Sequence, residues 1–92
     1  MEDILALKPA YEFSRSYSAE TKGVSKAMEK IRRTWSAVYY CNNDGGNIVS
    51  NHYSRGCLAI MQSKPEPSNF LLEIFSNDEK GLAKIVKSLD LD

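Results

Sequence analysis

Residues 35–53 read WSAVYYCNNDGGNIVSNHY, and this stretch decides the fold. Its first seven residues are rich in the β-branched and aromatic types that strands favour. The next five, Asn42 to Gly46, tolerate the positive φ angles of a tight turn between antiparallel strands. Residues 47–53 can then return as a second strand. The stretch therefore predicts a β-hairpin.

The sequence that follows the hairpin extends it into a sheet. A second turn is expected at residues 54–56 and a short apolar strand at residues 57–62. Residues 64–68 carry two prolines, which cannot donate ladder hydrogen bonds, so they form a loop. In residues 70–75, Phe70, Leu72 and Ile74 fall on one face and Glu73 on the other, which predicts a fourth strand. We expect a four-stranded antiparallel meander.

A helix is expected on the N-terminal side of this meander, from residue 18 or 21 to residue 34. Its apolar residues repeat at the spacing of a single helical stripe, and charged residues fill the other faces. The stripe consists of Val24, Ala27, Met28, Ile31 and Trp35.

A second helix is expected on the C-terminal side. Ser76 and Glu79 have the spacing of a capping box, with Ser76 as the N-cap residue. The apolar stripe that follows consists of Leu82, Ile85, Val86 and Leu89.

These elements predict one α+β domain over residues 1–92, because a chain of this length builds a single core. Residues 18–92 form the body, a two-layer sandwich in the order helix, four antiparallel strands, helix, with both helices on one face. Residues 1–17 form an aromatic N-terminal arm. In that arm, Pro9 interrupts the first apolar residues, and the spacing of Tyr11, Phe13 and Tyr17 suits either a strand or an arm on the body.

The predicted strands carry apolar residues on both faces, although two helices can cover only one face. A second copy of the chain, a partner protein or the N-terminal arm could cover the other face, since monomers seldom expose large apolar patches. The candidate interface residues are Val38, Tyr40, Leu58, Ile60, Tyr11 and Phe13. If the helices take the opposite face, the candidates from the strands become Tyr39, Ala59 and Met61.

The amino-acid composition limits the partners and the cellular compartment that we expect. Twelve basic and twelve acidic residues give zero net charge, so bulk attraction to nucleic acid or to an anionic membrane is not expected to dominate. No apolar run approaches the roughly 20 residues that span a bilayer, so we expect no membrane insertion. An acidic N-terminus and only two cysteines point to an intracellular protein, cytoplasmic or nuclear, rather than a secreted one.

Catalysis and metal binding are not expected. A nucleophile and base would have to come from His52 with Cys41 or Cys57. Hairpin spacing puts His52 about five positions from Cys41 along the ladder, beyond hydrogen-bond reach, and Cys57 suits a buried position. No spacing typical of a metal, phosphate or cofactor site occurs.

RNA binding is the alternative. Seven basic residues against three acidic ones lie between Arg15 and Arg55, many of them on the first helix. Basic groups beside aromatic strand residues are typical of single-strand binders. The candidate site residues are Lys26, Lys30, Arg32, Arg33, Tyr39, Tyr53 and Arg55.

Two fold-level resemblances bear on this choice. The order of helix, sheet and helix is similar to the small Alu-domain subunits of the signal recognition particle and to double-stranded-RNA-binding domains, which implies RNA binding. Residues 38–50 resemble the strand–turn–strand hairpin of roadblock and longin modules, which implies protein binding, but the helix that follows it in those families is absent here. We expect a non-enzymatic protein-interaction module, an adaptor, scaffold or assembly subunit that self-associates through its sheet, with RNA binding as the alternative.

Overall fold

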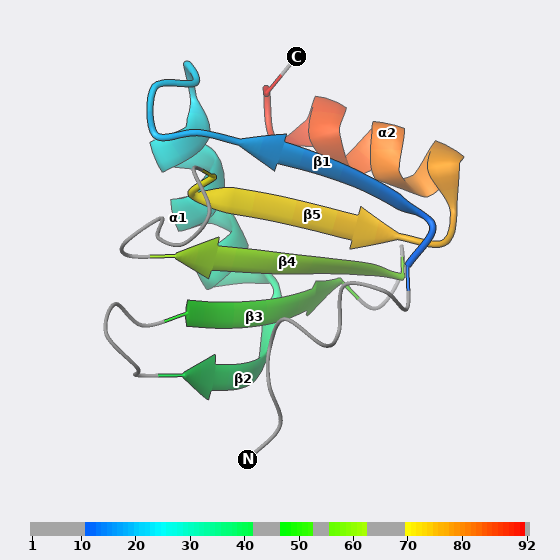
Figure 1. The fold of residues 1–92 in the computed structure, drawn as a ribbon, viewed down its shortest axis with the longest axis horizontal. Coiled ribbons are helices and arrows are strands. Elements are labelled where there is room, and N and C mark those ends of the chain that lie inside the picture. The colour runs from blue at the N-terminus through cyan, green and yellow to red at the C-terminus, as the bar shows by residue number, and fades with distance from the viewer. Residues whose placement is uncertain (1–10, 42–46, 53–55, 63–69, 92) are drawn as a thin grey trace.

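The computed structural model describes residues 11–41, 47–52, 56–62 and 70–91, with side chains for all of these except residues 37–41 and 47. Seven elements follow one another along the chain (Figure 1). They are β1 (Phe13–Tyr17), α1 (Val24–Thr34), β2 (Ser36–Cys41), β3 (Asn47–His52), β4 (Cys57–Gln62), β5 (Leu72–Ser76) and α2 (Glu79–Ser88). Among these residues, no helix has the length and apolar character needed to cross a bilayer.

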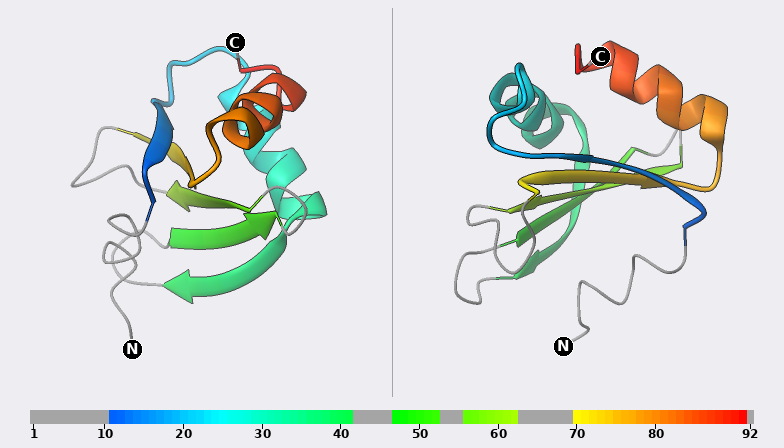
Figure 2. Two further views of the ribbon diagram at one scale, coloured as in Figure 1. Left: turned by 90° about the vertical axis from the view of Figure 1, so that its right-hand side faces the viewer. Right: turned by 45° about the horizontal axis from the view of Figure 1, so that its top comes forward.

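The strands form one antiparallel sheet in the order β1-β5-β4-β3-β2. Strands β2 to β5 are the predicted meander, and both helices lie on the same side of the sheet (Figure 2). The α+β class and the helix-flanked antiparallel meander are therefore confirmed.

The N-terminal arm differs from the expectation. Its residues 13–17 form β1, which pairs with β5 from Phe13 opposite Ser76 to Tyr17 opposite Leu72. The sheet thus has five strands, and a strand precedes the first helix. Pairing with β5 satisfies the backbone of this segment along one side, which an arm lying on side chains could not do.

The main core lies between the helices and the sheet. Both predicted helical stripes are buried there against alternate residues of β4 and β5. The sheet contributes Cys57, Ala59, Met61, Leu72 and Ile74 to this core. Burying side chains of this kind contributes about 1.5–3 kcal/mol each, so this layer holds the fold together.

The start of α2 corrects the predicted cap. Asp78 is the N-cap residue, and one carboxylate oxygen accepts a hydrogen bond from the backbone N–H of Lys80 at 3.2 Å. Ser76 is instead the last residue of β5. Its buried hydroxyl accepts from the Asp78 N–H at 3.0 Å and donates to the Asp78 carbonyl at 3.1 Å. Ser76 therefore shapes the turn into the helix while Asp78 caps it.

The far face of the sheet carries a second buried apolar cluster. Val49, Leu58, Ile60 and Phe75 form a second cluster there, and each is at most 5% exposed. Tyr11 packs against this cluster, with its ring centroid 6.2 Å from that of Phe75. The apolar residues predicted on both faces of the strands thus build a core on each side of the sheet.

Candidate interaction surfaces

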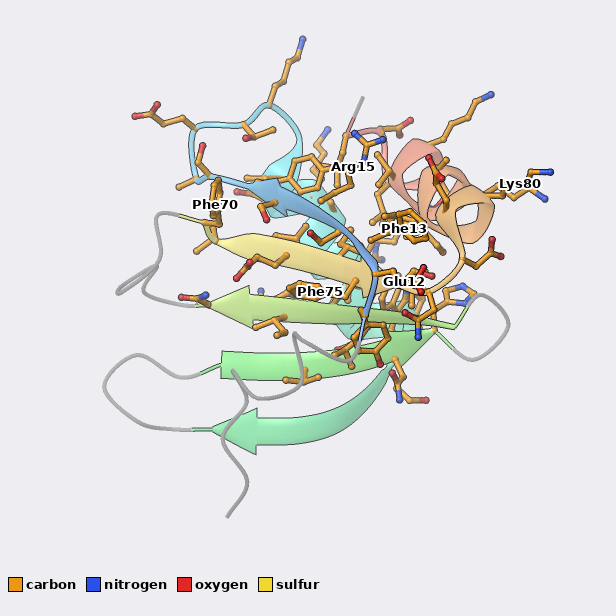
Figure 3. All side chains as sticks on the ribbon, turned by 45° about the vertical axis from the view of Figure 1, so that its right-hand side comes forward. Glu12, Phe13, Arg15, Phe70, Phe75 and Lys80 are labelled. Atoms are coloured by element: carbon orange, nitrogen blue, oxygen red, sulfur yellow. The ribbon has the colours of Figure 1, made fainter. Side chains whose placement is uncertain are left out.

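The predicted sheet-face interface is divided between separate places. Leu58 and Ile60 are only 4% and 1% exposed, so within one chain they have almost no surface to offer a partner. Tyr11 packs over their cluster. Phe13 packs against the helix-side core instead, beside α2 (Figure 3). The structure therefore does not bring these four side chains together into one accessible patch.

The remaining face candidates do not restore that patch. The side chains of Val38, Tyr39 and Tyr40 lie outside the described residues, although their backbone forms β2. Ala59 and Met61, the alternative set, are 0% and 1% exposed in the helix-side core. Neither face of β4 is accessible within one chain.

Strand β2 is one edge of the sheet. It pairs with β3 on one side, and no described strand pairs with its other side. The outer N–H and C=O groups of such a strand are a template for adding another strand. The sequence of β2, SAVYYC, contains no charged residue and no proline. The register against β3 shifts between Ala37 and Tyr39, and a bulge of this kind partly protects an edge.

Strand β1 forms the opposite edge and is better protected. Its sequence FSRSY places the exposed Arg15 at its centre. The side chain of Phe13 on this strand packs into the helix-side core, and α2 runs alongside (Figures 1 and 3). Charge and a neighbouring helix are devices that discourage strand addition. Among the described residues, β1 is therefore the better protected of the two edges.

The helix layer forms a basic surface on the side of the sheet away from the Val49 cluster. Among the nine Lys and Arg residues of the described ranges, seven lie on the two helices, against two acidic residues there, Glu29 and Glu79. The seven basic residues are all exposed, and they are Lys26, Lys30, Arg32, Arg33, Lys80, Lys84 and Lys87. Although the net charge of the chain is zero, its described basic residues are concentrated on the two helices.

The four predicted basic residues of α1 have different surroundings. The ammonium group of Lys30 donates to the Ser88 carbonyl at 3.0 Å, near the C-terminal end of α2. Lys26 and Arg33 border an open depression of about 380 Å³ between the helices, which Glu29, Lys30 and Asp90 also line. Arg32 borders another depression, of about 240 Å³, which Gln62 at the end of β4 also lines. Lys30 therefore has a structural partner, because a cation stabilises a helix C-terminus.

The aromatic part of the predicted RNA site cannot be placed with the helix. Tyr53 and Arg55 lie outside the described residues, as does the side chain of Tyr39. The Tyr39 backbone is paired with Val49 in the sheet. The described part of that site is therefore the helix surface alone.

The residues considered for catalysis are built into the sheet. Cys57 lies directly opposite His52 in the β3–β4 ladder and is 1% exposed. The His52 ring meets the Trp35 ring edge-on, with centroids 5.2 Å apart. Within the described ranges, no group of three His, Cys, Asp or Glu residues is placed to hold a metal ion.

No protein-family model, curated protein or solved structure matches this chain. The proposed function therefore rests on the surfaces described above.

Proposed function

We propose that this chain is a non-enzymatic protein-interaction module, an adaptor or a small subunit of a larger assembly, which joins its partner by strand addition at β2. The observation that carries the proposal is the open, uncharged, proline-free edge of the sheet. Strand addition uses main-chain hydrogen bonds for affinity and alternate side-chain pockets for specificity. We place the module inside the cell, cytoplasmic or nuclear, because the sequence has only two cysteines and so does not suit a disulfide-stapled secreted domain.

The burial of both faces of β4 favours a partner that binds at an edge of the sheet over one that binds on a face. A partner that docked on β4 would first have to uncover Leu58 and Ile60, which costs the free energy of their burial. A partner at β2 would pair with the outer side of the strand, where no described strand is hydrogen-bonded.

A peptide-display selection tests the proposal. Random extended peptides are selected against the dilute protein, and the binders are mapped by amide chemical shifts. We expect shifts concentrated in residues 36–41 and loss of binding in the Val38→Lys variant. The matched control, Ser14→Lys, adds the same charge at the opposite edge and should bind normally. Selected peptides that shift the amides of α1 and α2 instead would contradict the proposal.

RNA binding is the second candidate function, and the uneven charge distribution specifically favours it. The helix layer concentrates seven described basic residues on one side, which is the electrostatic footprint of a phosphate-binding surface. Lys26 and Arg33 border one depression and are the best-placed pair on α1.

Charge reversal tests this second candidate. Lys26→Glu with Arg33→Glu should abolish binding to an RNA pool, and the affinity of the wild type should fall steeply with salt because counterions are released. The control reverses the same number of charges on α2, Lys80→Glu with Lys84→Glu, and should retain more binding. A wild type that binds no RNA at low salt removes this function.

A further inference from the structure

We infer that the strand added at β2 is the β2 of a second copy of this chain, paired antiparallel over residues 36–41 about a two-fold axis. The inference rests on the proposed function and names its partner. It is carried by the charge pattern of the strand, the inequality of the two sheet edges and the symmetry of an antiparallel pair.

The charge pattern suits pairing of a strand with itself. A two-fold axis pairs the strand with an identical strand. Any charged side chain in one copy would therefore face a strand that carries the same charge. Like charges placed opposite each other across strands are destabilising. Residues 34–43, which include all of β2, contain no charged residue, so this penalty does not arise.

The chain as a whole also tolerates a second copy. Its formal net charge is zero, so two copies approach without the long-range repulsion that a strongly charged chain would meet. The β1 edge is less suited to self-pairing, since Arg15 at the centre of the strand would lie close to its own copy across the axis. A symmetric contact therefore favours β2 over β1.

Symmetry fixes the shape of the pair. The two-fold axis that relates two antiparallel neighbours in a sheet is perpendicular to that sheet, so the two five-stranded sheets become one continuous sheet. Both helix layers then lie on the same side of it (Figure 2). The pair presents one long basic surface made from the helices of both copies.

The contact should be reversible. A single six-residue strand pair is smaller than a standard protein–protein interface, and small interfaces are typical of weak association. We expect a monomer–dimer equilibrium with a dissociation constant in the micromolar range, in which the mass rises with concentration.

Sedimentation equilibrium tests the inference. The wild type should approach twice the chain mass at tens of micromolar, and Val38→Lys should remain a monomer with unchanged circular dichroism. The control variant Ser14→Lys, on the exposed outer part of β1, should dimerise like the wild type. A wild type that stays monomeric at these concentrations overturns the inference, as does a Val38→Lys variant that folds and dimerises.

A cysteine variant gives an independent test should Val38→Lys fail to fold. Full antiparallel overlap places Ser36 of one copy opposite Cys41 of the other, within the Cα separation that a disulfide requires. Ser36→Cys should form a linked dimer on mild oxidation, at least several-fold more than the wild type. Equal amounts from both proteins contradict the antiparallel pairing.

The two proposals can fail separately. A monomeric wild type that still binds extended peptides at residues 36–41 leaves the interaction module standing and removes the second copy as its partner. A monomer that binds no peptide at this edge overturns both.

Discussion

Gly23 begins α1 with a φ angle of 85°, a left-handed conformation that costs other residues about 1–2 kcal/mol. A Cβ atom there would also stand 3.2 Å from the carbonyl oxygen of Asp90, just beyond the end of α2. The positive φ and the nearby Asp90 carbonyl therefore both favour glycine at this position.

We expect Gly23→Ala to lower the free energy of unfolding by at least 1–2 kcal/mol, about the cost of the left-handed conformation. Gly56→Ala is the matched control, since Gly56 also has a positive φ, 62°, but nothing lies within 4 Å of an added Cβ. Urea denaturation should show the larger loss for Gly23→Ala. Equal losses would mean that the contact with Asp90 has no energetic effect.

The Asp78 cap makes a second prediction at the residue scale. Removing its side-chain acceptor with Asp78→Ala should cost about 1 kcal/mol, the usual loss for an N-cap. Asp78→Asn keeps an oxygen acceptor and should cost much less. Thermal denaturation of the two variants gives the comparison, and an Asp78→Asn loss as large as that of Asp78→Ala would show that the cap bond is not the cause.

At the scale of elements, α2 is held by its apolar stripe. Ile85 is 4% exposed in the helix-side core, so Ile85→Ala should cost about 2–5 kcal/mol through lost burial and the cavity left behind. Lys84 is on the exposed side of the same helix, and Lys84→Ala should change stability by less than about 0.5 kcal/mol. A loss below about 1 kcal/mol for Ile85→Ala would mean that α2 is not docked on the sheet.

The second face of the sheet makes an element-scale prediction about Ile60. Because this side chain is buried within one chain, Ile60→Ala should cost about 2–5 kcal/mol at every protein concentration. A residue in a dimer contact would instead lose more stability at high concentration than at low, because association stabilises the folded state by mass action. Denaturation at two protein concentrations distinguishes burial within one chain from a contact between copies. A loss of stability that grows with concentration would mean that Ile60 lies in a dimer interface.

Local patterns along the chain predicted most of these elements. The turn-rich segment after Cys41, the 3.6-residue stripes and the loop with two prolines are signals carried by neighbouring residues, and they identified two helices and four strands. Strand β1 was harder to assign, because Phe13–Tyr17 pairs with residues about 60 positions away and its sequence alone suits a strand or an arm. The predicted N-cap, Ser76, was wrong because Ser and Asp can both cap a helix, and Asp78 takes that position in the structure.

At the scale of the whole molecule, the candidate site was less predictable than the fold. The sequence showed that the strands are apolar on both faces, but not that the second face is buried within a single chain. It also could not show which strand ends the sheet, since edge positions depend on long-range pairing. The basic residues of α1 were visible in the sequence, whereas the contact of Lys30 with Ser88 depends on the packing of two distant helices.

The charges and the sheet edge together define the molecule that we propose: a sheet open at β2, with a basic helix layer on one side. Hydrogen–deuterium exchange of the wild type, measured on dilute and on concentrated protein, tests the central claim most directly. The account predicts that amides of residues 36–41 exchange more slowly in the concentrated sample, while those of residues 13–17 do not change. Exchange at residues 36–41 that is independent of concentration, or slowing confined to residues 13–17, would contradict it.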